Sequence, residues 1–243
     1  MIPQGDGSFP TTQWTLIARI KSADEAVASR ALDEICTQYL YPLYCYLRRR
    51  DCDHHDAQDV LHDFLARLLE HRALERVDEA SGRLRGYLST ALGRHLIGWR
   101  CSAARRADAG HVTTVSLDFH AIEDRYHHDH FTDGDTPDRI FERKWAIELL
   151  RQVIAKLAAR YEAKGRSPLF AALRPALERG GSLRGEDTPA LAAQLGLTPT
   201  ALRVAMTRLL DEFAEVIQAE VRLTVEHTEE VRDELAYLMG LFR

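Results

Sequence analysis

The sequence predicts an all-α protein with two helical domains joined by a polar linker. Strand patterns are nearly absent from the 243 residues, and the only short β-like stretch covers residues 112–117. Apolar residues instead recur at the three- and four-residue spacing of amphipathic helices in both halves of the chain. Residues 107–136 lack this spacing, which indicates a linker rather than part of a compact domain. We therefore expect domains at 1–106 and 137–243.

Three helices are expected in the first domain. The first covers residues 29–47, where Pro42 should kink or divide the helix because proline cannot donate the helical hydrogen bond. The clearest runs from Asp56 to Glu70, where apolar side chains repeat at i, i+4 and i+8 and the first aspartates lie outside that row. The third spans residues 84–99 and follows Gly82, which ends the segment before it.

The second domain is expected to begin with a long helix from Pro137 to about residue 161, followed by short pieces that proline and glycine separate. Residues 188–208 then match a helix-turn-helix, with Ala192 where the helices cross and Gly196 in the turn. Apolar residues for the inner faces stand at Leu191, Leu195, Leu197, Leu202 and Ala205. The threonine before each proline, Thr188 and Thr198, is expected to cap its helix. A C-terminal helix completes the domain.

The second helix of this motif should present a polar face that could bind DNA. Its outward residues are Thr198, Thr200, Arg203, Val204, Thr207 and Arg208. Arginine reaches base edges and phosphates, and threonine hydroxyls bond phosphate oxygens. Six acids against two arginines between residues 186 and 220 oppose this, so we expect weak, strongly salt-dependent affinity from the motif alone. The same pattern also fits a helix-turn-helix with no DNA role.

Charge alternates along the chain, although the net charge is only −5. Residues 51–70 carry six acids and one arginine, whereas residues 72–106 carry eight arginines and three acids. Residues 107–140 are again acidic and hold five of the eleven histidines, and residues 141–179 are basic. Such blocks indicate surfaces for different partners, or else ordinary solvated helix faces.

Several function classes find no support in the sequence. No apolar run approaches the roughly 20 residues of a membrane span, and no secretory signal is visible, so a cytoplasmic protein without membrane contact is expected. The four cysteines show no disulfide or zinc spacing. Phosphate-binding loops, dinucleotide fingerprints and hydrolase motifs are also missing, so we expect no enzyme activity and no cofactor. The linker histidines match no closed metal site, and we expect no bound metal.

Together these segments resemble a bacterial RNA polymerase sigma factor of the extracytoplasmic-function type, in the long form found in planctomycete-like bacteria. The resemblance runs from about Thr12 to Phe242 and rests on four stretches. They are DAQDVLHDFLARLLE (56–70), GRLRGYLSTALGRHLIGWRCSAARR (82–106), FERKWAIELL (141–150) and EEVRDELAYLMGLF (229–242). The resemblance implies a region-2-like first domain, a region-4-like second domain, and a role in directing core polymerase to promoters and melting them.

The resemblance assigns partners to these segments. The helix at 56–70 would bind the largest polymerase subunits through Asp56, Asp59, Val60, Leu61, Asp63 and Phe64. The −10 promoter element would be opened and read by Arg83, Arg85, Tyr87, Arg94, Trp99, Arg100, Arg105 and Arg106. Arginines neutralise phosphates and aromatic rings stack on exposed bases, which agrees with that role, although Tyr87 and Trp99 also fit a hydrophobic core. The outward face of the helix-turn-helix would contact the −35 element, and an anti-sigma protein is a candidate partner.

Three departures from the family bear on this interpretation. Arg94 and Gly98 stand where many relatives carry Asn and Asp, the helix-turn-helix continues into acidic sequence, and the linker is rich in His and Asp. The acidic linker could fold back on residues 83–106 and inhibit them. The alternative function is a helix-turn-helix regulator that does not bind polymerase, and a metal-dependent enzyme centred on the linker is a third class.

Overall fold

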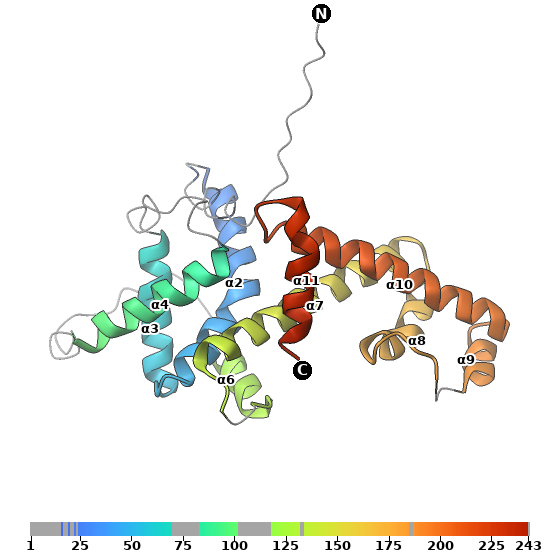
Figure 1. Cartoon of the computed structure of the whole chain (residues 1–243), viewed down its shortest axis with the longest axis horizontal. Coiled ribbons are helices and arrows are strands. Elements are labelled where there is room, and N and C mark those ends of the chain that lie inside the picture. Colours follow the sequence, from blue (N-terminus) through green and yellow to red (C-terminus); the bar gives the residue numbers. More distant parts are fainter. Residues whose placement is uncertain are drawn as a thin grey trace, which may run out of the picture. The chain divides into compact units, whose positions relative to one another are not determined.

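The computed structural model is an all-helical protein (Figure 1). It describes residues 16, 19, 22, 24–69, 83–101, 118–131, 134–184 and 187–242. Within these ranges the regular elements are α-helices and one short 3-10 helix, with no strand. The predicted all-α class is therefore confirmed.

The chain forms two compact units. The first combines residues 1–148 with residues 222–243, and the second covers residues 149–221. The division falls inside α7 (Pro137–Ala163) and inside α10 (Pro199–Arg222), so each of these helices contributes to both units. This division differs from the domain boundaries expected from the sequence. The C-terminal segment and the described part of the expected linker both belong to the first unit.

The first unit contains α2 (Glu25–Arg48), α3 (His54–Leu69), α4 (Leu84–Cys101), α6 (Phe119–His128) and the start of α7, followed at the C-terminus by the 3-10 helix η2 (Thr228–Glu230) and by α11 (Val231–Gly240). Asp24 caps α2 by accepting hydrogen bonds from the backbone N–H groups of Ala26 and Val27. Helix α2 continues through Pro42 rather than dividing there. Its C-terminal half is buried on nearly every side, which compensates for the hydrogen bond that proline cannot make.

Helix α2 supplies the aromatic centre of the first unit. Tyr39, Tyr44 and Tyr46 are all fully buried, and the Tyr39 ring lies 6.4 Å from Trp145 of α7. Helix α4 passes close to α2 at Gly93, where an added Cβ would lie 2.7 Å from the Tyr46 hydroxyl oxygen. Any larger residue at position 93 would therefore require the Tyr46 ring to shift, so glycine allows this close approach of α4 to α2.

The second unit contains the rest of α7, then α8 (Ser167–Glu178), α9 (Thr188–Gln194) and most of α10. Its core joins Leu157 and Phe170 to Ala192, Leu202 and Met206 of the helix-turn-helix. Gly196 has φ +64° in the turn between α9 and α10, a conformation that favours glycine.

Two local expectations about the helix-turn-helix need correction. Asp187, not Thr188, caps α9, because its carboxylate accepts from the backbone N–H of Ala190, while Thr198 caps α10 as expected by accepting from Ala201. Leu197, expected on an inner face, is 36% exposed because it lies in the turn after Gly196.

Candidate nucleic-acid interface

A groove between α3 and α4 brings together residues that the family resemblance assigns to different partners. Its volume is about 540 Å³ and its lining includes Tyr87, Arg94 and Trp99, all expected to bind promoter DNA. Asp63 and Phe64 of α3, expected to bind polymerase, line the same groove. The groove is therefore lined by aromatic side chains together with acidic and basic ones.

The polar side of this groove is organised around Asp63. One carboxylate oxygen lies 3.3 Å from Nε2 of His95, and the other accepts from Nε of Arg67 at 3.2 Å. The His95 ring also contacts Phe64, with ring centres 5.8 Å apart. Across the groove, burial raises the pKa of Tyr87 while the nearby Arg94 opposes that shift, so the phenol stays neutral at physiological pH.

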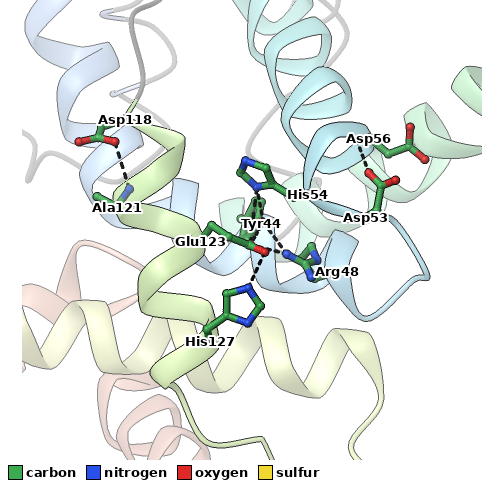
Figure 2. Close-up of polar contacts among 9 residues, drawn as sticks. All are labelled: Tyr44, Arg48, Asp53, His54, Asp56, Asp118, Ala121, Glu123 and His127. Carbon is green, nitrogen blue, oxygen red and sulfur yellow. Dashed lines mark hydrogen bonds and ion pairs between the residues drawn. The ribbon is translucent and has the colours of Figure 1, made fainter.

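The residues expected to bind polymerase divide into two groups. Val60, Leu61 and Phe64 are buried in the core of the first unit. Val60 and Leu61 hold α3 in place rather than offer a surface, whereas Phe64 also lines the groove. Asp56, Asp59 and Asp63 are partly exposed on the other face of the helix. Asp53 precedes α3 and accepts from the backbone N–H of Asp56 at 2.8 Å, which starts the helix beside this acidic face (Figure 2).

The arginines expected to bind DNA also divide. Arg94 and Arg100 are exposed, but Arg100 donates to the carbonyl oxygen of Arg50. Arg85 is only 3% exposed and pairs with Glu142 and Glu234, so it is not accessible to DNA in this conformation. The sequence expectation for Arg85 thus differs from its position in the structure, because a buried guanidinium with two carboxylates stabilises the fold. Arg105 and Arg106 lie outside the described residues.

Part of the segment expected to be a linker forms helix α6, a helix that the apolar spacing does not predict. Asp118 caps it by accepting from the backbone N–H of Ala121 at 3.0 Å (Figure 2). Phe119 is buried, and its ring centre lies 4.9 Å from that of His62 on α3. The sequence does contain a helix-start signal here, because Asp118 precedes apolar residues at positions 119, 122 and 126.

Glu123 is the centre of the contact between α6 and α2. Its carboxylate accepts from the Tyr44 hydroxyl and the Arg48 guanidinium, and His127 Nε2 lies 2.9 Å away (Figure 2). His54, at the start of α3, lies 3.6 Å from the same carboxylate. Burial raises the pKa of Glu123, but the hydrogen bonds from Tyr44 and Arg48 and the charges of Arg48 and His127 together lower it by more, so the net pKa falls below its ordinary value.

A second set of contacts ties the end of α6 to α7. Asp129 accepts from the Tyr41 hydroxyl at 2.5 Å and lies 2.6 Å from Nζ of Lys144, while Arg125 pairs with Glu148. The described part of the acidic segment thus meets α2, α3 and α7. The charged side chains of this segment attach α6 to α2 and α7 within the first unit.

In the second unit, the outward face of α10 is exposed as the sequence predicted. Thr200, Arg203, Thr207 and Arg208 are all exposed, and Val204 is 46% exposed. Within the part of the chain that the structure describes, no ion pair holds Arg203 or Arg208. A groove of about 750 Å³ borders this face, and its lining includes Leu197, Thr198, Val204 and Arg208.

The described residues give no indication of a metal centre or a membrane span. Across residues 24–69, 83–101, 118–131 and the later described ranges, no three His, Cys, Asp or Glu side chains are arranged to hold a metal ion. Among the same residues, no helix combines the length and apolar character needed to cross a bilayer. His111 lies outside the described residues.

Comparison with known proteins gives no relative: no family model, no curated protein and no solved structure matches the chain.

Proposed function

We propose that the chain is a promoter-specificity subunit of bacterial RNA polymerase, a sigma factor of the extracytoplasmic-function type. The observation that carries the proposal is the groove between α3 and α4, where Tyr87, Trp99 and Arg94 line one cavity. The sequence resemblance had assigned these three residues to the opened −10 element. The second domain would then contribute duplex contacts through the helix-turn-helix.

The groove suits a base that has left the duplex stack. Tyr87 and Trp99 offer aromatic faces on which a base can stack, and Arg94 offers a guanidinium for the adjoining phosphate. Asp63 and His95 add hydrogen-bonding groups at the same place. A cavity of about 540 Å³ also exceeds what a single planar base requires, so the base and part of its sugar could enter.

The acidic face of α3 suits a basic protein partner. Asp56 and Asp59 are partly exposed beside Asp63, and the buried residues of the same helix fix its orientation. In this proposal the face binds the largest polymerase subunits, and the groove on the α4 side receives the opened strand. The chain performs no covalent chemistry; polymerase forms the phosphodiester bonds.

The helix-turn-helix supports the duplex contact of this proposal. Arg203 and Arg208 project from exposed positions on α10, and the exposed Thr200 and Thr207 of the same face carry hydroxyls that can bond phosphate. The acids that follow, Asp211, Glu212 and Glu215, repel phosphate, although Lys164 neutralises Glu212 at 3.1 Å. Duplex binding by this unit is therefore weak on its own and depends on polymerase to bring it to the promoter.

Reconstitution with core polymerase tests the proposal. We expect the full chain to bind core enzyme and to direct specific run-off transcripts from genomic DNA fragments. Asp59→Lys should weaken core binding, whereas Asp233→Lys makes the same charge change at an exposed site on α11 and should not. Absence of specific transcripts at every salt concentration, with the protein folded, would reject the sigma assignment.

The exposed face of α10 also favours a second candidate, a DNA-binding regulator that does not use polymerase. The two candidates differ in one measurement. A regulator binds a specific duplex without co-purifying with core enzyme, and its binding is unaffected by Asp59→Lys. A sigma factor requires core enzyme for specific promoter binding.

A further inference from the structure

Helix α11 holds the two arginines at the N-terminal end of α4. Glu234 has no exposed side-chain surface, and Arg83 lies 2.8 Å from its Oε2 atom. The guanidinium of Arg85 donates to its Oε1 atom. One carboxylate from the end of the chain therefore engages both of the first basic residues of the expected DNA-binding helix.

The far end of α11 and the surroundings of Arg85 keep this contact in place. Nε of Arg143 donates to the carbonyl oxygen of Leu241 at 3.0 Å. Arg85 also pairs with Glu142 at 2.6 Å and lies over the Trp145 ring at 4.6 Å from its centre. Helix α11 is thus fixed at both ends to the first unit, beside α7 (Figure 1).

The two arginines differ in what they would do if α11 moved away. Arg85 would keep Glu142 and Trp145 as neighbours and would stay buried. Arg83 is 39% exposed, and Glu234 is its ion-pair partner within the described residues. Displacement of α11 would therefore release mainly Arg83 for another anion.

We propose that α11 competes with nucleic acid for the N-terminal end of α4. The Glu234 carboxylate presents two anionic oxygens to two guanidinium groups, which is how a backbone phosphate is also bound. The phosphate of a DNA strand and Glu234 cannot occupy the same donors together. Nucleic acid must displace α11 to use the side of the Arg83 guanidinium that faces Glu234, so the C-terminal helix weakens DNA binding by the isolated chain. This inference rests on the proposed function, because it takes DNA as the ligand.

A double-mutant cycle in the full chain tests the competition. The probe is a fluorescein-labelled single-stranded DNA oligonucleotide, measured by anisotropy over a range of salt concentrations. Glu234→Gln removes the charge that holds the arginines, and Asp233→Asn removes an exposed charge from the neighbouring position. We expect Glu234→Gln to raise affinity about fivefold and to steepen the salt dependence by about 0.7, the amount for one further phosphate on a single strand. Asp233→Asn should change affinity less than about twofold.

Arg83→Gln completes the cycle. It should lower the affinity for the oligonucleotide only slightly in the wild-type chain, because Glu234 already pairs with Arg83 there. In the Glu234→Gln chain it should lower the affinity several-fold. Arg94→Gln, an exposed arginine on the same helix, should cost the same in both backgrounds. Equal effects of Arg83→Gln in both backgrounds, or equal effects of Glu234→Gln and Asp233→Asn, would overturn the competition.

A second variant covers the case in which Glu234→Gln does not fold. Leu238→Ala removes a buried contact of α11 without changing any charge, and it should also raise affinity. Circular dichroism identifies which variants are folded. Loss of binding in Arg94→Gln with no gain in either α11 variant rejects the competition and retains the proposed function. No binding of the single strand by any folded chain rejects the competition, and run-off transcription with core polymerase decides the proposed function separately.

Discussion

Lys144 of α7 and Asp129, the residue after α6, form an ion pair with Nζ and Oδ2 2.6 Å apart, although the lysine side chain is only 4% exposed. The same aspartate accepts from the Tyr41 hydroxyl of α2 at 2.5 Å. Segments from α2, the end of α6 and α7 therefore meet at one carboxylate. The contact explains why the region expected to be a linker folds with the first unit.

Removal of Asp129 should destabilise the protein because it leaves the Lys144 ammonium buried without its carboxylate. We expect Asp129→Asn to lower the free energy of unfolding by about 2 kcal/mol, below the range for fully buried pairs because Asp129 is partly exposed. Replacing both partners, in Asp129→Asn with Lys144→Met, should restore most of that stability, since an apolar side chain needs no partner. Urea unfolding of the two single variants and the double variant measures this, and additive losses would contradict it.

The attachment of α6 should weaken in acid. The pKa values of Glu123 and Asp129 are both below their ordinary values, so each carboxylate stabilises the folded protein above the ordinary carboxyl range. That contribution is lost as the pH falls through the lowered pKa of each group. We expect the hydrogen-exchange protection factors of residues 119–128, relative to the intrinsic exchange rate at each pH, to fall below about pH 4, before those of the core of α2. In Glu123→Gln this fall should be smaller, because one of the two titrating groups is gone.

The α3–α4 groove should bind single strands through its aromatic residues. Trp99→Ala should weaken binding of a single-stranded oligonucleotide by about 1–3 kcal/mol, the loss typical of one stacked base. Tyr87→Phe should keep most of the affinity that Tyr87→Ala loses, because the ring and not the hydroxyl supplies the stacking. Thr90→Ala, at an exposed position of α4, is the matched control. Equal losses for Tyr87→Phe and Tyr87→Ala would indicate that the hydroxyl is the binding group.

The sequence predicted the helices whose apolar spacing is regular. The segments at 56–70, 84–99 and 137–161 correspond to α3, α4 and α7, and the helix-turn-helix corresponds to α9 and the start of α10. Helix α6 was missed because it has few apolar residues, and its position depends on Glu123 and Asp129 finding partners on α2 and α7. Ion pairs between distant segments leave no periodic pattern in a sequence.

Arg85 illustrates the same limit within the candidate site. It lies one residue after Leu84 on the buried side of α4, but a basic residue in a basic segment favours a DNA contact when the sequence alone is read. Its partner Glu234 is 149 residues away, and the second partner, Glu142, is on another helix. Tyr87, Arg94 and Trp99 could be predicted together because all three lie in the basic segment at 82–106, which the family resemblance assigns to the −10 element.

Val204 should read a thymine methyl group in the duplex bound by α10. It is 46% exposed on a face otherwise formed by arginine and threonine, and apolar side chains at such positions contact the C5 methyl of thymine in the major groove. The duplex is first selected from a random library by the full chain with core polymerase. Deoxyuridine then replaces each thymine in turn, which removes only the methyl group. At one position we expect wild-type affinity to fall about fourfold, equivalent to about 0.8 kcal/mol for one buried methyl group.

In Val204→Ala the same substitution should change affinity less than about twofold, because the shorter side chain no longer reaches the methyl group and so has little contact to lose. Thr200→Ala is the control, since it removes a hydroxyl from the same face and should keep the preference for thymine over deoxyuridine even if it weakens binding. A preference that survives in Val204→Ala would assign methyl recognition to another residue. If the wild-type chain shows no preference for thymine over deoxyuridine, then this face of α10 recognises DNA through Arg203 and Arg208 alone.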